Sequence, residues 1–193
     1  MRTERTRLVR HAAGAVAVLA VMAGALAAMG RVWWCRAGDP HLWSGADEIL
    51  SRHNSQHLVD PYAFTHVLHG LVFYALVWVV LRGRAGATGR AWAGFLLEVA
   101  WEILENTDAV IGRYRTATIA LDYYGDSIAN SVADVVAYLA GYGLAAVLPV
   151  QASVAAFVLV DGALALWIRD GLVLNVWMLL WPIAAVLRWQ SGG

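Results

Sequence analysis

Residues 66–81 read HVLHGLVFYALVWVVL, a nearly unbroken apolar run that begins with two histidines three positions apart. Apolar runs of this length and composition are typical of helices that cross a membrane. The rest of the chain agrees, since 60% of its 193 residues are hydrophobic and its mean hydropathy is +0.58. Soluble domains are about 45–50% apolar. The sequence therefore predicts an all-α, polytopic transmembrane helical bundle.

Hydropathy predicts about six helices in a single integral membrane domain that covers residues 1–193. The predicted spans are 11–29, 66–81, 91–107, 128–148, 152–168 and 171–187, with an outer loop over 30–65. Each span is close to the ~20 residues that cross ~30 Å of hydrocarbon. Acidic residues interrupt the span 91–107, so it can insert only against partner helices. Residues 1–29 fit an uncleaved anchor, with a cleaved signal peptide as the alternative.

Arginines flank the predicted spans and indicate an orientation. Four precede the first span, three lie between the second and third, and one follows the last, which predicts cytoplasmic N and C termini in a bacterial inner membrane. The polar clusters described below then all face outward. The 14 basic residues, all arginine, are balanced by 14 acidic ones, so no basic excess points to nucleic acid as a partner. The single Cys35 excludes an internal disulfide, and we assign it no role.

The two histidines of the second span, His66 and His69, lie on one helix face near the outer boundary. Imidazole is a common metal ligand and titrates near neutrality, so this pair can hold a metal ion or move protons. Two buried histidines that simply bond neighbouring helices are the alternative. With Glu98 of the third span, they form our predicted metal ligands.

Glu98, Glu102 and Glu105 follow an i, i+4, i+7 pattern, so the three carboxylates occupy one narrow stripe of the third span. A charged side chain at bilayer depth costs at least ~2.5–3.5 kcal/mol, so this stripe is expected to face the protein interior. Carboxylates so close together favour acid–base chemistry. Pairing with Arg113 and Arg115 is the structural alternative, and both roles can hold at once.

Further polar residues follow the third span. Arg113 and Arg115 form a forked donor set suited to phosphate or carboxylate. Asp126 precedes the fourth span, where capping by Asp126 or Ser127 is a structural explanation. Capping does not explain Asn130 and Asp134, which lie four and eight residues after Asp126. The predicted catalytic residues are Glu102, Glu105, Asp126 and Asp134, and the predicted ligand-binding residues are Arg113, Arg115, Asn106, Asn130 and Tyr124.

A set of short motifs between about residues 30 and 190 resembles an uncharacterised family of bacterial inner-membrane proteins, known mainly from alphaproteobacteria. The motifs are Ser55-Gln56-His57, Asp60-Pro61-Tyr62, His66-x-x-His69-Gly70, Trp101-Glu102-x-x-Glu105-Asn106, Arg113-Tyr114-Arg115, Asp122-Tyr123-Tyr124-Gly125-Asp126-Ser127, Asn130-Ser131-x-x-Asp134 and Ile168-Arg169-Asp170. The resemblance implies a location and a topology but no reaction, because the family's conserved domain has no known function. Gly171 stands where the family pattern leads us to expect Asn, and the second Cys near Cys35 is absent.

The order of the polar residues is also similar, more loosely, to that of VanZ-like proteins, which have been linked to glycopeptide resistance and the cell envelope. The residues that follow this order are Asp60, His66, Glu98 or Glu102, Arg113 or Arg115, Asp126 and Asn130. This similarity implies outward-facing chemistry on a lipid-linked or head-group substrate.

The sequence thus supports three hypotheses. In the first, an outward-facing polar cavity binds or hydrolyses an envelope lipid or amphiphile, with a divalent metal as the candidate cofactor and membrane lipids as partners. In the second, the same residues form a proton or ion relay in a non-catalytic binding or transport module. In the third, the chain is a structural partner of an envelope complex. Whether the chain is an enzyme, and its oligomeric state, do not follow from the sequence.

Overall fold

A computed structural model describes residues 2–192, and in this part of the chain every regular element is an α-helix. The helices are α1 (Arg2–Ala28), α2 (Ala63–Leu81), α3 (Ala87–Glu105), α4 (Asp108–Ala117), α5 (Ile128–Val147), α6 (Val150–Trp167), α7 (Leu172–Leu180) and α8 (Ala184–Gln190). One isolated bridge, between Trp43 and Val59, lies in the loop that joins α1 to α2. The expectation of an all-α protein is confirmed.

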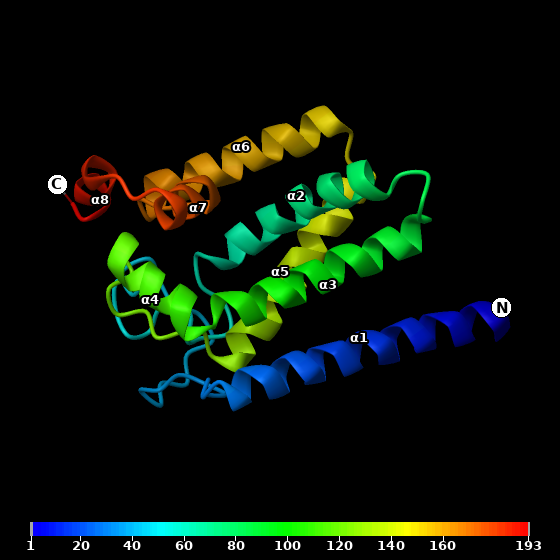
Figure 1. The fold of residues 1–193 in the computed structure, drawn as a ribbon, viewed down its shortest axis with the longest axis horizontal. Helices are drawn as coiled ribbons and strands as arrows, with labels where there is room; N and C mark the ends of the chain where they lie inside the picture. The colour runs from blue at the N-terminus through cyan, green and yellow to red at the C-terminus, as the bar shows by residue number, and fades with distance from the viewer. Residues whose placement is uncertain (1, 193) are drawn as a thin grey trace.

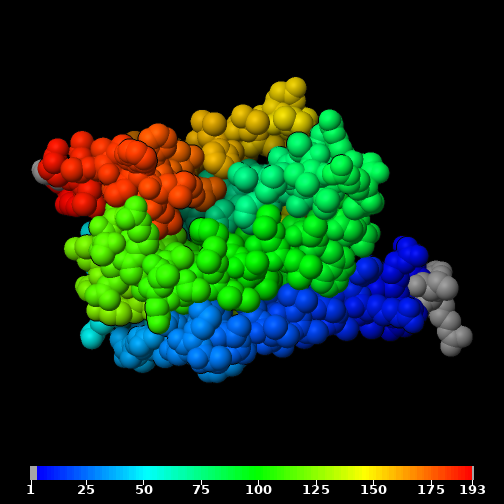
Figure 2. Space-filling model, in the orientation of Figure 1, coloured from blue at the N-terminus to red at the C-terminus, as the bar shows by residue number. Residues whose placement is uncertain are grey.

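The long helices α1, α2, α3, α5 and α6 run alongside one another, and the short ones gather at one end (Figure 1). Helix α2 packs most extensively against α5 and also contacts α3 and α6, while α1 covers α3 and α5. Figure 2 shows α1, in blue, lying along the green surface of α3 for most of its length. The connections between α2 and α3 and between α5 and α6 lie at the end where α1 begins.

Four helices are long and apolar enough to cross a membrane among residues 2–192: Glu4–Ala28 of α1, all of α2, all of α5 and all of α6. Helix α3 has the length of α2, but Arg90 and its three glutamates give it too much charge to qualify on composition. The prediction of about six spans is therefore too high. A polytopic helical membrane protein is what the fold supports.

The predicted sixth span, 171–187, is wrong as a continuous helix because the chain breaks at Trp181-Pro182. Helix α7 ends at Leu180, and Trp181 adopts φ −141° and ψ 81° before α8 begins at Ala184. Proline lacks a backbone N–H and its ring clashes with the preceding turn, so it disfavours helical geometry at the residue before it. As a result the C-terminal end of the chain and the start of α1 lie at opposite ends of the bundle (Figure 1).

Two glycines allow α2 and α5 to approach backbone to backbone. A Cβ at Gly141 would overlap the Val67 carbonyl, and one at Gly70 would overlap the Tyr138 carbonyl. Small residues permit such close approach between membrane helices. Beside this contact, apolar side chains of α1, α3 and α5 form the largest core cluster: Met22, Ala23, Leu26, Phe95, Val99, Ile128, Val135 and Tyr138. In contrast, Leu164 is the one buried residue of α6, whose remaining apolar surface suits contact with lipid.

Candidate functional site

A small cavity lies in the half of the bundle away from the start of α1, between α2, α3 and α5. It holds about 50 Å³ of space for water-sized groups, and residues of the α1–α2 loop, α4 and α7 also line it. One water needs roughly 10–15 Å³ by such a measure, so a few waters, or an ion with one ligand group, fill the cavity. Its polar lining residues are Asn54, Ser55, Tyr62, Thr65, His66, His69, Glu105, Tyr114, Tyr123, Asp126, Asp134 and Asn175.

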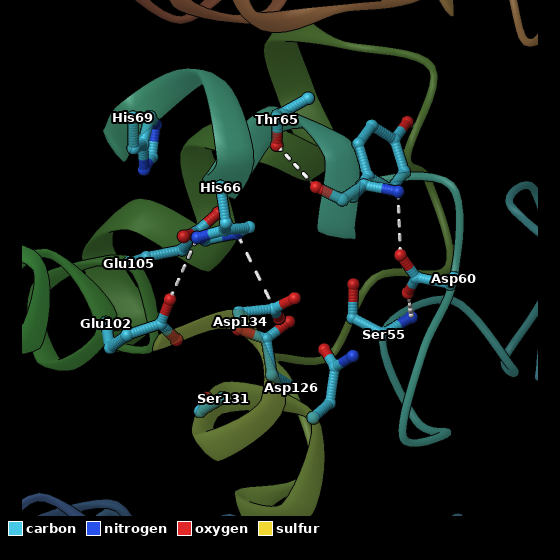
Figure 3. Close-up of polar contacts among 12 residues, drawn as sticks. Ser55, Asp60, Thr65, His66, His69, Glu102, Glu105, Asp126, Ser131 and Asp134 are labelled. Carbon is cyan, nitrogen blue, oxygen red and sulfur yellow. Dashed lines mark hydrogen bonds and ion pairs between the residues drawn. The ribbon is translucent and has the colours of Figure 1, made fainter. Parts of the chain in front are cut away.

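His66 is the centre of the site because carboxylates approach both of its ring nitrogens. Its Nδ1 lies 2.8 Å from Glu98 Oε1 and 3.2 Å from Glu102 Oε1, and its Nε2 lies 3.9 Å from Asp134 Oδ2. Figure 3 shows the imidazole between Glu102 on α3 and Asp134 on α5. Glu98 and Glu102 come from α3 and Asp134 comes from α5, and both helices pack on α2. Tertiary packing therefore brings His66 together with acids from two other helices.

Glu98 holds both histidines of α2 in place. His69 Nδ1 lies 3.3 Å and 3.2 Å from the two Glu98 oxygens, so one carboxylate accepts hydrogen bonds from two imidazoles. The His69 ring also stands edge-on to Trp101 and packs against Phe73. The Glu98 side chain is fully buried, and both of its carboxylate oxygens are hydrogen-bonded to histidines. Glu98 is therefore suited to orient the rings of His66 and His69.

Other polar atoms in the site have no hydrogen-bond partner in the part of the chain that the structure describes. They include both carboxylate oxygens of Glu102, Oδ1 of Asp134, Oε2 of Glu105 and both side-chain polar atoms of Asn130. Glu102, Asn130 and Asp134 are almost completely buried, at 0%, 1% and 4% exposure, whereas Glu105 is partly exposed. Buried polar atoms in native proteins are rarely unpaired, so this cluster is suited to a bound ion, water or ligand group.

A second polar network joins the end of α3 to the start of α5. The Asn106 amide donates to Asp126 Oδ2 at 2.7 Å, and the Asp126 backbone N–H donates to Asn106 Oδ1 at 2.8 Å. The Tyr123 hydroxyl donates to Asp126 Oδ1 at 2.9 Å. Burial raises the pKa of Asp126, while the bonds from Asn106 and Tyr123 oppose that shift. Ser127 rather than Asp126 caps α5, because its Oγ accepts from the Asn130 backbone N–H at 3.1 Å.

The opposite wall of the cavity is formed by α3, α4 and α7. The Tyr114 hydroxyl lies 2.8 Å from Glu105 Oε1 and 3.1 Å from Asn175 Oδ1. Asn175 in turn lies 3.4 Å from Asp170, whose carboxylate also accepts from the Tyr62 hydroxyl at 3.0 Å. These contacts attach α7 to the cavity.

Arg113, Arg115 and Tyr124, predicted as ligand-binding residues, do not line the cavity. Arg113 Nε donates to the Leu179 carbonyl at 2.7 Å, and Arg115 Nε donates to the Leu121 carbonyl at 3.1 Å. The Arg115 guanidinium lies 4.7 Å from the centroid of the Tyr124 ring. Tyr114 takes the cavity side of α4, so the residues on either side of it in the sequence point elsewhere. The structural alternative, in which these arginines pair with the Glu stripe, is also absent from the ion pairs of the described residues.

Several residues of the site were not among the predicted ones. Tyr62, Tyr114 and Tyr123 each donate to a carboxylate, and Asp60 accepts from the Tyr62 N–H at 2.7 Å and the Ser55 N–H at 3.1 Å. Burial raises the pKa of Asp60 to about 6. Each tyrosine lies in a short motif with charged neighbours, which was the available signal, but a hydroxyl partner cannot be assigned before the helices are placed.

Apolar helices of membrane-crossing length around a carboxylate-rich cavity define a multi-pass membrane protein with a buried polar site. Comparison with known proteins identifies its relatives. The chain belongs to the family described as "Protein of unknown function (DUF2585)", which matches residues 26–192. No solved structure matches it.

Its relatives among curated proteins include several described as UPF0314 proteins. One from Paracoccus denitrificans is 53% identical over 84% of this chain and 83% of its own length. Others from Rhizobium meliloti and Agrobacterium fabrum are 46% and 39% identical, over 91% and 99% of this chain and 87% and 95% of their own. The resemblance to an uncharacterised alphaproteobacterial family is thereby confirmed, whereas the comparisons lend no support to the VanZ-like similarity.

Proposed function

We propose that this protein is an inner-membrane hydrolase whose cavity holds a divalent metal ion and cleaves an envelope lipid or amphiphile. One observation carries the proposal: the buried Glu102 and Asp134 approach His66 from two helices with carboxylate oxygens that have no hydrogen-bond partner among the described residues. His66 and Asp134 also line a space of a few water volumes. Two carboxylates and an imidazole are a common ligand set for divalent metals such as zinc, iron and manganese. Without a cation, Glu102 and Asp134 could not both stay charged in this buried site, so at least one of them would have to bind a proton.

His66, Glu102 and Asp134 are the proposed metal ligands. One ligand atom from each lies within 4.8 Å of the others. Two ligands that each lie about 2.0–2.2 Å from one ion are at most about 4.4 Å apart, so small side-chain rotations close the set. The sequence-based set of His66, His69 and Glu98 meets the same distance limit. We prefer the first set because Glu98 is already engaged with both imidazoles, as an outer carboxylate that orients a histidine ligand.

A bound divalent ion would lower the pKa of a coordinated water and make it a nucleophile at neutral pH. The protein's own groups then have defined tasks. Glu98 fixes the orientation of His66, and Glu105 with the Tyr114 hydroxyl can hold a proton on the opposite wall. Asp126 is anchored by Asn106 and Tyr123, so it forms a fixed part of the cavity wall and lies ready to accept a hydrogen bond from substrate.

The surroundings of the cavity support an amphiphile as substrate. An open apolar groove of about 610 Å³ runs along α7 and shares Leu172 and Val176 with the cavity. Trp177, Leu180 and Trp181 on this groove are largely exposed. The cavity itself is too small for a whole lipid head group. A substrate would therefore place a small scissile group in the cavity and an acyl or prenyl chain in the groove.

We propose an orientation with the start of α1 in the cytoplasm. That end of the bundle carries seven of the fourteen arginines, in the N-terminal segment, the α2–α3 connection and the start of α3, and its one acidic residue is Glu4. Arginine-rich short loops face the cytoplasm. If α3 crosses with its neighbours, the number of crossings is five. The cavity then opens outward, and the C-terminus, expected in the cytoplasm from the sequence, is proposed to lie outside.

A proton or ion relay is the rival function, favoured by the contacts to both nitrogens of His66. A relay needs a polar path to the other side of the membrane. On the cytoplasmic side of the cavity in this orientation, however, Gly70 and Gly141 bring α2 and α5 into backbone contact, and the apolar core lies beside them. The site thus has the form of a cavity with a closed floor.

Metal analysis of gently purified protein tests the proposal. We expect Glu102→Gln and Asp134→Asn each to contain one divalent ion per chain fewer than the wild type, together with loss of cleavage products when the protein is incubated with an inner-membrane lipid extract. Arg113→Gln is the matched control, since it alters a polar residue outside the cavity and should leave both results unchanged. Wild-type protein that binds no ion in the cavity, yet supports normal function in the cell, would leave the relay or binding role.

A further inference from the structure

The loop between α1 and α2 covers residues 29–62 without a helix or strand. Loops longer than about 12–15 residues without secondary structure are uncommon and are usually functional. Within this loop, Cys35 meets His53 and His57, although it lies 18 residues before His53. Cys35 Sγ lies 3.5 Å from His53 Nδ1, which lies 3.3 Å from His57 Nε2. Cys35 and His57 are buried at 6% and 1% exposure.

The two distances are those expected between ligands of one tetrahedral zinc ion. Zinc–sulfur and zinc–nitrogen bonds of about 2.3 Å and 2.0–2.1 Å give edges of about 3.5 Å from sulfur to nitrogen and about 3.3 Å between nitrogens. The third pair of ligand atoms also lies within 4.8 Å. Three ligands of the types that zinc prefers are thus arranged around one point.

The histidine nearest the protein interior is already held in the tautomer that a metal requires. His57 Nδ1 lies 2.6 Å from the His41 carbonyl oxygen, which can only accept, so Nδ1 carries the hydrogen. The lone pair of a neutral His57 is then on Nε2, the atom that faces His53 and Cys35. A backbone carbonyl that fixes the second ring nitrogen is a regular feature of histidine ligands. Trp34 packs edge-on against the same ring and limits its rotation.

The position of the cluster indicates a structural role for the ion. His53 and His57 flank Asn54 and Ser55, which close the cavity of the candidate site. Ser55 has a φ of +55°, a left-handed conformation that is uncommon outside glycine, and its carbonyl accepts from the Ser127 N–H at 2.9 Å. A metal bound on both sides of this turn would tie it to the start of the loop at Cys35.

We propose that Cys35, His53 and His57 bind a divalent transition-metal ion, zinc by its ligand chemistry, with water in the fourth position, and that this ion fixes the loop over the cavity. The site is separate from the one proposed around His66 and does not depend on it, because that cluster contains no sulfur. The competing arrangement is a hydrogen bond from His53 to His57 with a free thiol beside it.

Cobalt substitution of the full-length protein in detergent tests the inference. After removal of bound metal with a chelator, Co²⁺ should produce a sulfur-to-cobalt charge-transfer absorption together with the visible bands of a tetrahedral ion. Zinc added afterwards should abolish both signals. The charge-transfer absorption should be missing in Cys35→Ser but retained in Glu102→Gln, whose carboxylate belongs to the other site. In His57→Gln, zinc affinity should fall by more than the roughly 10- to 100-fold typical of losing an outer partner.

His41→Gln is the matched control within the loop. The His41 side chain is exposed and contacts Asp39, and only its backbone carbonyl touches the cluster, so this variant should bind cobalt like the wild type. Wild-type protein without the charge-transfer absorption would overturn the inference, whether or not the variants fold. Retention of the absorption in Cys35→Ser would overturn it as well, because no other cysteine is present in the chain.

Discussion

Glu98 and Glu102 are neighbours on one helix face, but their exchange for glutamine should have different consequences. Glu98→Gln should lower the stability of the fold, whereas Glu102→Gln should abolish metal binding. Glu98 accepts from His66 and His69, and a glutamine offers one carbonyl oxygen in place of two charged ones. At least one charge-assisted hydrogen bond is lost, at about 1.5–3 kcal/mol. In a chain of this size each kcal/mol lowers the melting temperature by about 2–4 °C, so Glu98→Gln should melt about 3–12 °C lower.

Glu102→Gln loses no hydrogen bond, since neither oxygen has a hydrogen-bond partner among the described residues and Oε1 has only the ion-pair contact of 3.2 Å with His66 Nδ1. Its melting temperature in the presence of a chelator should therefore stay within about 3 °C of the wild type. Adding Mn²⁺ at 100 times its dissociation constant should stabilise the wild type by about 2.7 kcal/mol, and this increment should vanish in Glu102→Gln.

Thermal unfolding in detergent, followed by the fluorescence of the ten tryptophans, measures both quantities. Equal destabilisation of the two variants in chelator would refute the division between an orienting and a ligating glutamate. So would a Glu98→Gln variant as stable as the wild type.

Three further outcomes follow from the fold. Gly141→Ala should destabilise the protein by at least about 1–3 kcal/mol, because the added Cβ overlaps the Val67 carbonyl. Gly143→Ala is the control and should be neutral or stabilising, because the space around Gly143 is open. Equal melting temperatures for the two variants would contradict the close contact of α2 and α5. Burial raises the pKa of Asp60 from 3.8 to about 6, so between these values the folded protein keeps a proton that the unfolded chain releases. Stability should fall by roughly 2 kcal/mol as pH rises from 4 to 6, and by roughly 3 kcal/mol in all between about pH 3 and pH 7. Unfolding at several pH values should show a weaker fall in Asp60→Asn, and an identical slope would exclude this group as the cause. A reporter active only outside the cytoplasm should work when fused near residue 45 and at the C-terminus but not near residue 86, and silence at the C-terminus would restore an even number of crossings.

The helical bundle and the convergence of its polar residues follow from simple sequence patterns. An i, i+4, i+7 stripe of glutamates and an i, i+3 histidine pair can enter a membrane only if they face one another, and His66, Glu98 and Glu102 do meet in the structure. The pattern could not assign individual roles. Glu98 and Glu102 are equivalent in the sequence, and only the placement of α2 decides which of them bonds the imidazoles.

The errors arise where a local signal was outweighed or where no periodic signal exists. Hydropathy over residues 171–187 outweighed Pro182, although one proline is sufficient to end a helix. Arg113 and Arg115 looked suited to ligand binding by type, but Tyr114 takes the inward face of α4. The approach of Cys35 to His53 and His57 could not be foreseen, because an irregular loop has no repeat from which to infer which residues share a side.

An anomalous-scattering map from crystals of the protein grown with Mn²⁺ tests the central claim most directly, because manganese favours oxygen and imidazole ligands over thiolate. We predict one strong peak in the cavity, about 2.0–2.2 Å from ligand atoms of His66, Glu102 and Asp134. A cavity that contains only ordered water on the unpaired oxygens of Glu102 and Asp134, at saturating Mn²⁺, would contradict the account.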